Sequence, residues 1–429
     1  MSSLSKPTII PDDDFSTVSS RSDSALSNLG RNLLLSQLSQ IQDGELRIQC
    51  GEQHWRYGQR TERCPLIATI YVDHPQFFAD AAFGGTTGAG EAYINGHWRC
   101  DDLTALVRIM VVNRHVMDQM EGGLAAISNW ARRTLHWFNR NSKAGSARNI
   151  AAHYDLGNDL YELMLDKTMA YSCGIFAHEQ ATMYDASIAK FDAVCRKLAL
   201  TPNDHLVEIG TGWGGLAMHA AERYGCRVTT TTISREQHDF ARDKIAARGL
   251  SDRITLLFED YRDLKGRFDK LVSIEMIEAV GARYLDTYFS KCSSLLQPNG
   301  AMLLQAITLQ DQMYAQALKS VDFIQRYVFP GSFIPSVTAI TDSLTRVTDL
   351  KVFNLEDIGP HYARTLRLWR ERFFANIEQV RKLGYPESFS RLWDFYLCYC
   401  EGGYAERQLG NVQMLLTKPA CRRAPILAT

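Results

Sequence analysis

Five short apolar runs alternate with helical patterns in this chain, and the alternation restricts its fold more than any other feature of the sequence. The predicted strands cover residues 205–210, 227–233, 254–257, 270–274 and 301–307, and helices are predicted at 216–224, 234–245 and 284–296. Strands that alternate with helices at this spacing form a parallel sheet with helices on both faces. The sequence therefore predicts an α/β fold with a doubly wound sheet.

A glycine-rich turn follows the first predicted strand. Residues 208–214 read Glu-Ile-Gly-Thr-Gly-Trp-Gly, and a helical pattern begins directly afterwards. Glycine allows positive φ and a close approach of the backbone to a ligand, and a helix start offers unpaired N–H groups. In a doubly wound sheet, ligands bind near this first turn. The turn also fits a tight strand-to-helix connection without a ligand, and both interpretations stay open on these residues alone.

The carboxyl ends of the other strands meet at the same edge of the predicted sheet. Thr232, Asp260, Glu278 and Ile307 lie at or just after these strand ends. Glu278 stands in an apolar stretch, where a carboxylate needs a partner, and this favours a functional role. Glu275, three residues earlier, is a second acid that the pattern does not separate from Glu278.

The second strand ends without the acid that binds ribose in many dinucleotide enzymes. Its last residues are Thr231, Thr232, Ile233 and Ser234, which argues against an ordinary dinucleotide ligand. A purely structural interpretation is a strand end followed by a helix N-cap, and we expect Ser234 to be the N-cap in either case.

Composition fits a globular protein with reduced thiols. The 429 residues are 45% hydrophobic and 22% charged, and the net charge of −1 argues against a general nucleic-acid binder. The ten cysteines form no Cys-x-x-Cys pair and suggest no metal site, and the first residues lack an apolar signal segment. We therefore expect a cytoplasmic protein. No apolar run approaches the roughly 20 residues that span a bilayer, so lipid would be met from the surface.

The chain divides by composition into four segments. Residues 1–27 are rich in Ser and Asp and are predicted to be a disordered tail. Residues 28–138 are expected to form a small α+β domain that provides lipid or dimer contacts. Residues 139–149 are small and polar, as in a linker, and residues 150–429 contain the doubly wound sheet.

Local patterns within the N-terminal domain predict individual elements. We expect a hairpin at 45–57, a strand at 66–72 and a short helix at 77–83. A longer helix is expected from Asp101 to a break at Gly122. The segment 124–138 mixes Arg with Trp and Phe, which fits either contact with anionic headgroups or an ordinary packed helix with a solvated basic face.

Several motifs, taken together, resemble a known family. They are the 208–214 turn, Thr232-Ile233-Ser234-x-x-Gln237, the 260–263 and 273–281 segments, the 152–159 segment, Tyr171-Ser172-Cys173, the 327–331 segment and Tyr362-x-x-Thr365-Leu366. This set is similar to S-adenosylmethionine-dependent methyltransferases and, more narrowly, to the cyclopropane-fatty-acyl-phospholipid synthase family. The resemblance covers about residues 151–417. It implies a Rossmann-like methyltransferase sheet with helical lid insertions, and the N-terminal part resembles the extra domain of bacterial members.

The resemblance implies S-adenosylmethionine as methyl donor. The matching cofactor-binding residues are Tyr171, Ser172, Glu208, Gly210, Gly212, Gly214, Thr232, Ile233, Gln237, Asp260 and Tyr261. Asp260 and Tyr261 would flank the adenine, and Tyr171 and Ser172 would close over the cofactor.

The implied reaction is unusual. A cis alkene of an acyl chain attacks the activated methyl group, and the resulting carbocation closes to a cyclopropane when a base removes a proton from the new methyl group. Water or a strong nucleophile would trap the cation, so the site must exclude both. In the family a bound bicarbonate ion is the base.

The residues that match the family's bicarbonate site and its surroundings are His153, Cys173, Glu278, Gln305, Ile307, Tyr362 and Cys400. Glu278 would hold the bicarbonate, Tyr362 would donate to it, and Cys173 and Ile307 would offer backbone groups. Without the resemblance, His153 would be interpreted as a helix-capping or core residue, Cys173 as a small buried residue, and Tyr362 equally well as a core residue.

The sequence departs from many bacterial members at two positions. Gln305 stands where they have His, and Ala279 stands where they have the His of a Glu-His pair, whereas plant-type members resemble this chain in having Gln. Gln305 hydrogen-bonds but does not titrate near neutral pH. Ring formation is still expected, with transfer that stops at a methyl-branched or methylene-bearing chain as the alternative.

The implied substrate is a phospholipid acyl chain at the inner face of the membrane, and a homodimer is expected. Aromatic residues at 309–333 and 373–399 fit an acyl tunnel as well as plain core. A non-catalytic lipid-binding protein with the same fold is the alternative from another functional class.

Overall fold

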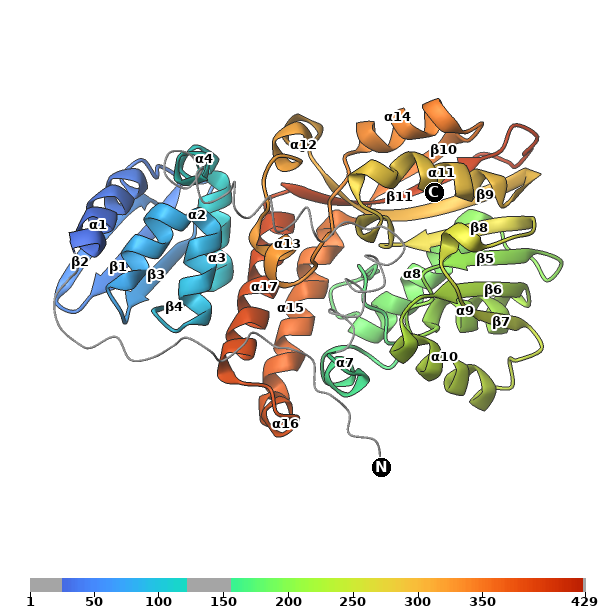
Figure 1. Ribbon diagram of the computed structural model, residues 1–429, viewed down its shortest axis with the longest axis horizontal. Helices are drawn as coiled ribbons and strands as arrows, with labels where there is room; N and C mark the ends of the chain where they lie inside the picture. Colours follow the sequence, from blue (N-terminus) through green and yellow to red (C-terminus); the bar gives the residue numbers. More distant parts are fainter. Residues whose placement is uncertain (1–24, 122–155, 427–429) are drawn as a thin grey trace.

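The computed structural model describes residues 25–121 and 156–426, which form two sheets with helices around and between them (Figure 1). A four-stranded sheet belongs to the N-terminal part and a seven-stranded sheet to the rest. Residues 1–24 of the predicted tail, the linker at 139–149 and the basic aromatic segment at 124–138 lie outside the described residues. The tail was predicted to extend to residue 27, which is wrong at its end because a helix already begins at Ala25.

The seven-stranded sheet has the order β10-β11-β9-β8-β5-β6-β7. Its strands are β5 (His205–Ile209), β6 (Arg227–Thr232), β7 (Ile254–Phe258), β8 (Phe268–Ile274), β9 (Leu296–Leu309), β10 (Lys351–Asp357) and β11 (Leu409–Thr417). The five predicted strands, β5 to β9, pair in parallel, and β11 runs antiparallel to both β9 and β10. The predicted doubly wound α/β fold is confirmed, and β10 and β11 extend it.

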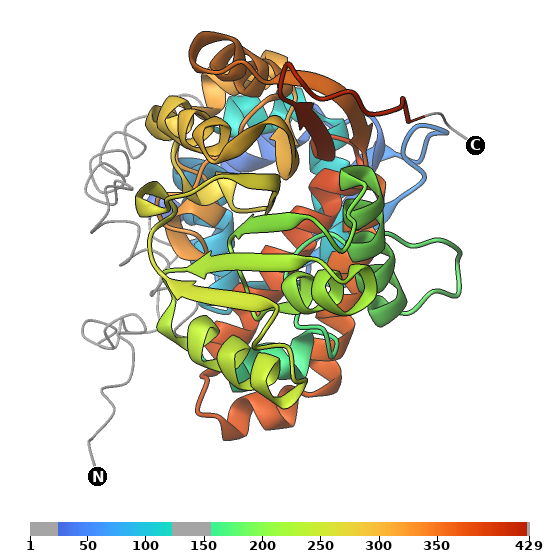
Figure 2. The same ribbon diagram turned by 90° about the vertical axis from the view of Figure 1, so that its right-hand side faces the viewer.

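Alternate residues of the strands face two separate helix layers. Leu206 and Val272 pack with α8 (Met183–Leu198), α9 (Gly215–His219) and α10 (Arg235–Ala247). Val207 and Leu271 pack on the other face with α11 (Leu285–Ser294) and α14 (Val337–Val347). Figure 2 shows the central strands in this view, with α10 beside β6 and β7. The edge at which the carboxyl ends of the parallel strands meet therefore belongs to a sheet that is buried on both faces.

The N-terminal sheet has the order β2-β1-β3-β4. Its elements are α1 (Ala25–Leu38), β1 (Gly44–Cys50), β2 (Gln53–Gln59), β3 (Ile67–Val72), α2 (Gln76–Ile94), β4 (Trp98–Cys100), α3 (Leu103–Val112) and α4 (Arg114–Glu121). The predicted hairpin forms between β1 and β2, with Gly51 at φ 58° in its turn. The predicted strand is β3.

Two helix predictions in this domain were wrong in extent. The helix expected at 77–83 continues as α2 to Ile94, across a kink at Gly85, where φ is 60°. The helix expected to run unbroken from Asp101 to Gly122 is split at Asn113. The Asn113 side chain accepts hydrogen bonds from the backbone N–H groups of Gln42 and Asp43. These long-range contacts hold Asn113 in a non-helical conformation, and the helix is interrupted there.

A third prediction needs correction in the sheet. Residues 284–296 were expected to be helical, but α11 ends at Ser294. Leu296 is already the first residue of β9 and pairs with Phe268 of β8. The next registered pair is Ala301 with Lys270, so the residues between Leu296 and Ala301 bulge from the ladder.

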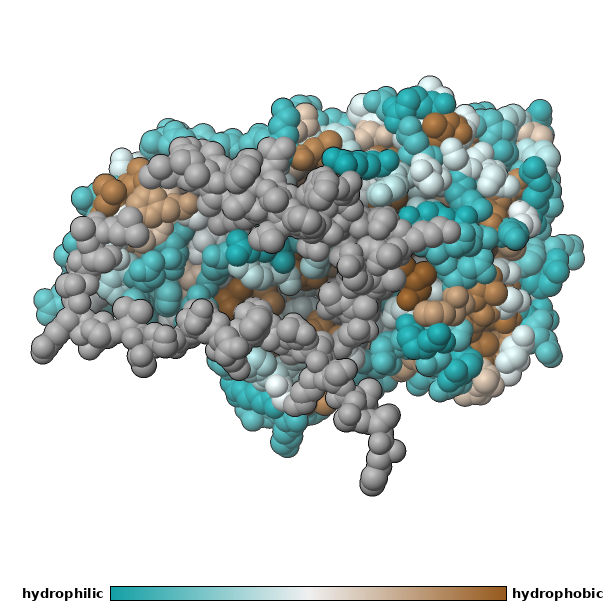
Figure 3. Space-filling model, viewed as in Figure 1, coloured by the Kyte–Doolittle hydropathy of each residue, from teal (hydrophilic) through white to brown (hydrophobic). Residues whose placement is uncertain are grey.

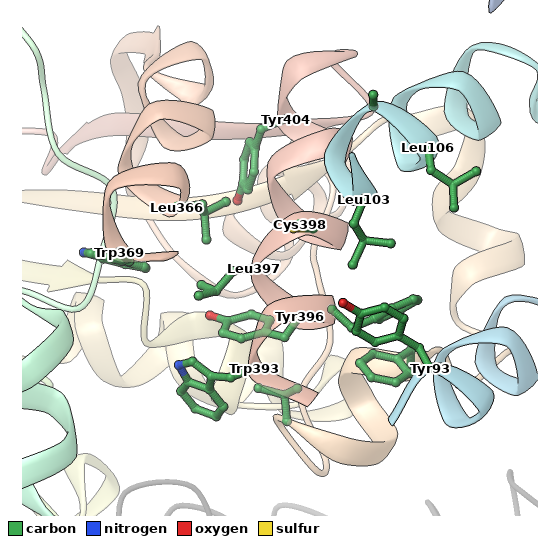
Figure 4. Packing of buried hydrophobic residues seen from close by; sticks show 14 of the residues in the cluster. Tyr93, Leu103, Leu106, Leu366, Trp369, Trp393, Tyr396, Leu397, Cys398 and Tyr404 are labelled. Atoms are coloured by element: carbon green, nitrogen blue, oxygen red, sulfur yellow. The ribbon is translucent and has the colours of Figure 1, made fainter. Parts of the chain in front are cut away.

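Two long helices join the sheets. α15 (Gly359–Ala375) and α17 (Glu387–Ala405) stand between them, and Figure 4 shows Tyr93, Leu103 and Leu106 of the N-terminal domain beside the buried residues of α17. The Tyr93 hydroxyl donates to Asp394 at 2.6 Å. Among the described residues, further α-helices are α7 (Asn158–Met164), α12 (Asp311–Ala317), α13 (Phe323–Tyr327) and α16 (Ile377–Lys382).

Within the described parts of the chain, no helix has both the length and the apolar character to span a bilayer. The face of the molecule in Figure 3 mixes hydrophilic and hydrophobic residues.

Candidate active site

The glycine turn after β5 uses three left-handed residues. Gly210, Gly212 and Gly214 have φ values of 98°, 52° and 87°. A Cβ at Gly210 would lie 3.3 Å from Met276, whereas a Cβ at Gly212 would meet no atom of the described residues within 4 Å. The turn therefore leaves open space beside Gly212, as the close approach of a cofactor to the backbone requires.

The end of β6 is polar without being acidic. The Thr232 hydroxyl donates to Oε1 of Gln237 at 2.9 Å, and both side chains are buried. Ser234 caps α10, as predicted, by accepting a hydrogen bond from the Gln237 N–H at 3.3 Å. Ile233 lies partly buried between them. The pair of Thr232 and Gln237 lies at the strand end where the sequence places a cofactor.

Glu208 lies inside the sheet. Its carboxylate accepts a hydrogen bond from Thr230 of the neighbouring strand at 2.6 Å. Burial raises the pKa of Glu208 to about 8, although the Thr230 bond and the charge of Lys190 oppose the shift. Its assignment to the cofactor stays a prediction.

Asp260 and Tyr261 follow β7. The Asp260 carboxylate caps the short turn Tyr261–Asp263 and binds the Arg262 guanidinium through contacts of 2.8 and 2.7 Å. The Tyr261 ring stands edge-on to Tyr288, with centroids 5.6 Å apart. Arg262 thus neutralises the carboxylate that was expected to flank an adenine.

The segment with Tyr171 and Ser172 is held from two sides. The Tyr171 and Tyr396 hydroxyls are 2.9 Å apart, and the Tyr171 ring centroid lies 5.0 Å from that of Trp369. Ser172 accepts a hydrogen bond from Lys190 at 2.6 Å. Lys190 is fully buried on α8, and burial lowers its pKa. This lysine was not identified from the sequence, and its hydrogen bond to Ser172 fixes the predicted cofactor segment on the side of α8.

Glu275 is the hydrogen-bonding centre of the site. Its Oε1 accepts from the Cys173 N–H at 3.0 Å, from Gln305 at 2.8 Å and from Asn411 at 2.7 Å. Its Oε2 accepts from the Tyr362 hydroxyl at 2.6 Å. Glu275 has a φ of 48°, in the left-handed region that non-glycine residues rarely adopt. One strained residue therefore ties together the loop at Cys173, β9, β11 and α15.

Glu278 lies one turn further along the chain and is only half satisfied. Its Oε1 accepts from the Ile307 N–H at 2.6 Å, and its Oε2 is buried without a hydrogen-bond partner among the described residues. Burial, followed by the nearby charge of Glu275, raises the pKa of Glu278 to about 8. A buried polar atom without a partner is costly unless a ligand completes it.

The neighbours of Glu275 are fixed in orientation. Gln305 donates to Glu275 and accepts from Gln413 at 2.9 Å, so its amide orientation is defined. Cys173 is fully buried, and burial raises the pKa of its thiol well above the usual value. The Cys173 thiol donates to the Gly174 carbonyl at 3.3 Å. A buried thiol that donates a hydrogen bond and has a raised pKa is a structural group and not an activated nucleophile.

The other predicted residues are placed as follows. Tyr362 is buried and donates a hydrogen bond from its hydroxyl to Glu275, so its expected donation to bicarbonate stays a prediction. Cys400 lies partly buried on α17, and burial raises the pKa of its thiol. His153 lies outside the described residues.

Four functional candidates escaped the sequence analysis or were undervalued by it. Glu275 was noted only as a second acid, and Lys190, Asn411 and Gln413 were not identified. Asn411 and Gln413 belong to β11, which was not predicted. A polar residue at alternate positions of an otherwise apolar run was the available signal. Within the described residues, no cluster of His, Cys, Asp or Glu is arranged to hold a metal ion.

The arrangement fits a methyl donor beside an acyl site. The open space at Gly212 and the polar pair Thr232 and Gln237 mark a cofactor edge. Glu278 and Glu275 follow β8, which pairs with β5, and the aromatic rings of Tyr171 and Trp369 pack against each other at the segment that also contains Cys173. The donor set therefore suits a polar cofactor that meets an apolar substrate.

Comparison with known proteins gives the same result. The family model of mycolic acid cyclopropane synthetases matches residues 141–414. The tuberculostearic acid methyltransferase UfaA1 of Mycobacterium tuberculosis is 36% identical over 373 residues, which cover 82% of this chain and 84% of that protein. The cyclopropane-fatty-acyl-phospholipid synthase of Escherichia coli K12 is 34% identical over 361 residues, covering 82% and 88%.

A solved structure agrees with the fold. The mycolic acid cyclopropane synthase CmaA1, complexed with SAH and CTAB, superposes with a TM-score of 0.60 at 31% identity, over 63% of this chain and 98% of that chain. The chain therefore belongs to the family of mycolic acid cyclopropane synthetases, the cyclopropane synthase-like methyltransferases that use S-adenosylmethionine.

Proposed function

We propose that the chain transfers a methylene group from S-adenosylmethionine to a cis double bond of a phospholipid acyl chain and forms a cyclopropane. The observation that carries the proposal is the buried Glu278 carboxyl, whose Oε2 has no partner among the described residues while Oε1 accepts from the Ile307 N–H. Such a half-satisfied group can hold the base that ring closure needs.

The cofactor supplies an electrophilic methyl group when it is bound. Gly210, Gly212 and Gly214 would admit it close to the backbone, and Thr232 and Gln237 would bind its polar part. The acyl double bond gives its π electrons to the methyl carbon as the methyl–sulfur bond breaks. A base then removes a proton from the new methyl group, and the electrons of that C–H bond close the ring.

The base that we propose is bicarbonate. Because the pKa of Glu278 is raised to about 8, its carboxyl is mainly protonated at neutral pH. A protonated Oε2 donates a hydrogen bond, as an anion requires. Glu278 is thus suited to hold a bicarbonate ion beside the Ile307 backbone without itself taking the proton.

Aromatic side chains would protect the cation from water. Tyr171, Phe329, Trp369 and Tyr396 form one connected group of rings, with Tyr171 at its centre. Aromatic and apolar walls exclude water. Burial raises the pKa of the nearby Cys173 thiol, so this group is not an activated nucleophile that would trap the cation.

A second product is favoured by one specific observation. Gln305 takes the place of a titratable residue and is fixed by Glu275 and Gln413, and the relative UfaA1 is a tuberculostearic acid methyltransferase. Transfer that ends in a methyl-branched or methylene-bearing chain is therefore the alternative to ring closure.

We also propose that the enzyme works at the inner face of the membrane as a homodimer, since a phospholipid acyl chain must be drawn from a bilayer. The substrate supports only the place at the membrane, and the homodimer carries over the expectation from the sequence. Flotation with phospholipid vesicles and light scattering of the purified chain would test the two statements separately.

Lipid analysis of cells that express the chain tests the proposed reaction. We expect acyl chains heavier by one methylene group and without a reducible double bond. The matched control is Glu278→Ala, which removes the group that would hold the base and should leave the lipids unchanged. The same mass gain with an intact double bond would select the alternative product, and unchanged lipids with the wild-type chain would reject both.

A further inference from the structure

Tyr404 has a buried hydroxyl group without a partner. The residue is only 2% exposed at the C-terminal end of α17, and its hydroxyl oxygen makes no hydrogen bond with any described residue. Oε2 of Glu278 is likewise buried without a hydrogen-bond partner among the described residues. Nearly all buried polar groups in folded proteins are paired, so each of these two atoms points to a missing polar partner.

The position of Tyr404 brings it to the active site. Its ring lies against that of Tyr362, with centroids 4.6 Å apart and planes inclined by 32°. Tyr362 in turn reaches Glu275 with its hydroxyl. Figure 4 shows Tyr404 with its hydroxyl end directed between α17 and α15. Burial raises the pKa of Tyr404, and the nearby carboxylate of Glu275 adds to the increase.

The buried Tyr404 hydroxyl lowers the stability of the fold unless a ligand forms a hydrogen bond with it. Phenylalanine would fill the same space and keep the ring contact with Tyr362 without leaving an unpaired donor. A phenol O–H is foremost a donor, and a protonated Glu278 presents a second donor nearby. Two donors suit an oxygen-bearing anion and not an acyl chain, which has no acceptor at this depth.

We propose that the Tyr404 hydroxyl donates a hydrogen bond to the same small oxyanion that Oε2 of Glu278 binds. Tyr404 is thereby a further residue of the base site, contributed by α17. The inference rests on the proposed function for the identity of the anion, which we take to be bicarbonate. Tyr362 stays engaged with Glu275 and orients the Tyr404 ring.

The test uses thermal unfolding of the purified chain and of Tyr404→Phe, with added sodium bicarbonate or with sodium chloride at the same pH and ionic strength. A ligand that binds only the folded state raises the unfolding temperature. We expect bicarbonate to stabilise the wild type and to have little effect on Tyr404→Phe. Without bicarbonate, the variant should be as stable as the wild type or more stable, because it buries no unpaired hydroxyl.

The matched control is Tyr93→Phe, which removes a buried phenol hydroxyl that is bonded to Asp394. This variant should be less stable in both salts and keep the full response to bicarbonate. In turnover assays, the bicarbonate concentration for half-maximal rate should rise about tenfold or more for Tyr404→Phe, with unchanged affinity for SAH.

The outcomes separate the two proposals. An equal bicarbonate response in Tyr404→Phe and wild type would overturn the role of Tyr404, and so would a wild type that bicarbonate does not stabilise. A loss of stability in Tyr404→Phe without bicarbonate would also overturn it, since the hydroxyl would then have a protein partner. If the wild type responds to bicarbonate but modifies no lipid, the proposed function fails while the assignment of Tyr404 stands.

Discussion

The Tyr362 hydroxyl donates to Oε2 of Glu275 at 2.6 Å, and this bond joins α15 to the strained turn after β8. The other oxygen of Glu275 accepts from Cys173, Gln305 and Asn411. A carboxylate with four donors is an acceptor that no neutral side chain reproduces. Glu275 therefore positions the surroundings of Glu278.

Replacement of this acceptor should loosen the whole site. In Glu275→Gln, the amide NH₂ would face a donor, and we expect the free energy of unfolding to fall by about 3 kcal/mol, with at least a tenfold loss of activity. Urea denaturation and turnover with phospholipid vesicles measure the two effects. The matched control is Glu371→Gln on the exposed face of α15, which should change stability by less than about 0.5 kcal/mol. Equal behaviour of the two variants would contradict the role of Glu275.

The raised pKa of Glu278 predicts a pH dependence of stability. A carboxyl with a pKa of about 8 in the folded state and near 4.5 when unfolded stabilises the fold fully below the lower value. That contribution is lost as pH rises through the folded value. Glu278→Gln mimics the protonated form, so its stability relative to the wild type should increase between about pH 5 and pH 8 by on the order of a few kcal/mol.

Glu208 has a similar pKa and stays in both proteins, so only the difference between wild type and Glu278→Gln isolates Glu278. Urea denaturation at a series of pH values gives this difference. A constant difference across the range would show that Glu278 has an ordinary pKa in the folded protein.

The glycine turn gives a prediction with an internal control. Gly212 and Gly249 have φ values of 52° and 66°, and in the described part of the chain a Cβ at either would meet no atom within 4 Å. Alanine at each should cost about 1 kcal/mol of backbone strain. Only Gly212→Ala should also lose affinity for SAH, by about tenfold or more, because its methyl group would occupy the space of the cofactor.

Calorimetric titration with SAH checks this pair, since Gly249 follows the far end of α10. Equal SAH affinities in the two variants would place the cofactor away from Gly212.

Much of the fold could be predicted because its signals are local. Each of β5 to β9 is a short apolar run followed by a turn or a helix, and Ser234 is an N-cap by residue type. β10 is mostly exposed, with little apolar pattern, and joins the sheet only through β11. Its pairing depends on long-range contacts that no local window contains.

The site was predicted in its residues but not in its connections. Spacing alone could not show that Glu275 and Glu278 have different roles, because the φ of 48° at Glu275 alters the direction of its side chain. Asn411 donates to Glu275 from β11, far along the chain, so no local motif could predict this contact. Lys190 lies in a helix whose pattern is ordinary, and only its burial against Ser172 marks it.

The most direct test of the account is the fate of a fully deuterated methyl group. The purified chain is incubated with S-adenosylmethionine labelled in this way, with bicarbonate and with vesicles of a phospholipid that carries cis double bonds, and the acyl chains are analysed by mass spectrometry before and after hydrogenation. We predict a product that has lost one deuteron from the transferred carbon and does not take up hydrogen. A product that keeps the complete label, or that takes up hydrogen, would contradict ring closure.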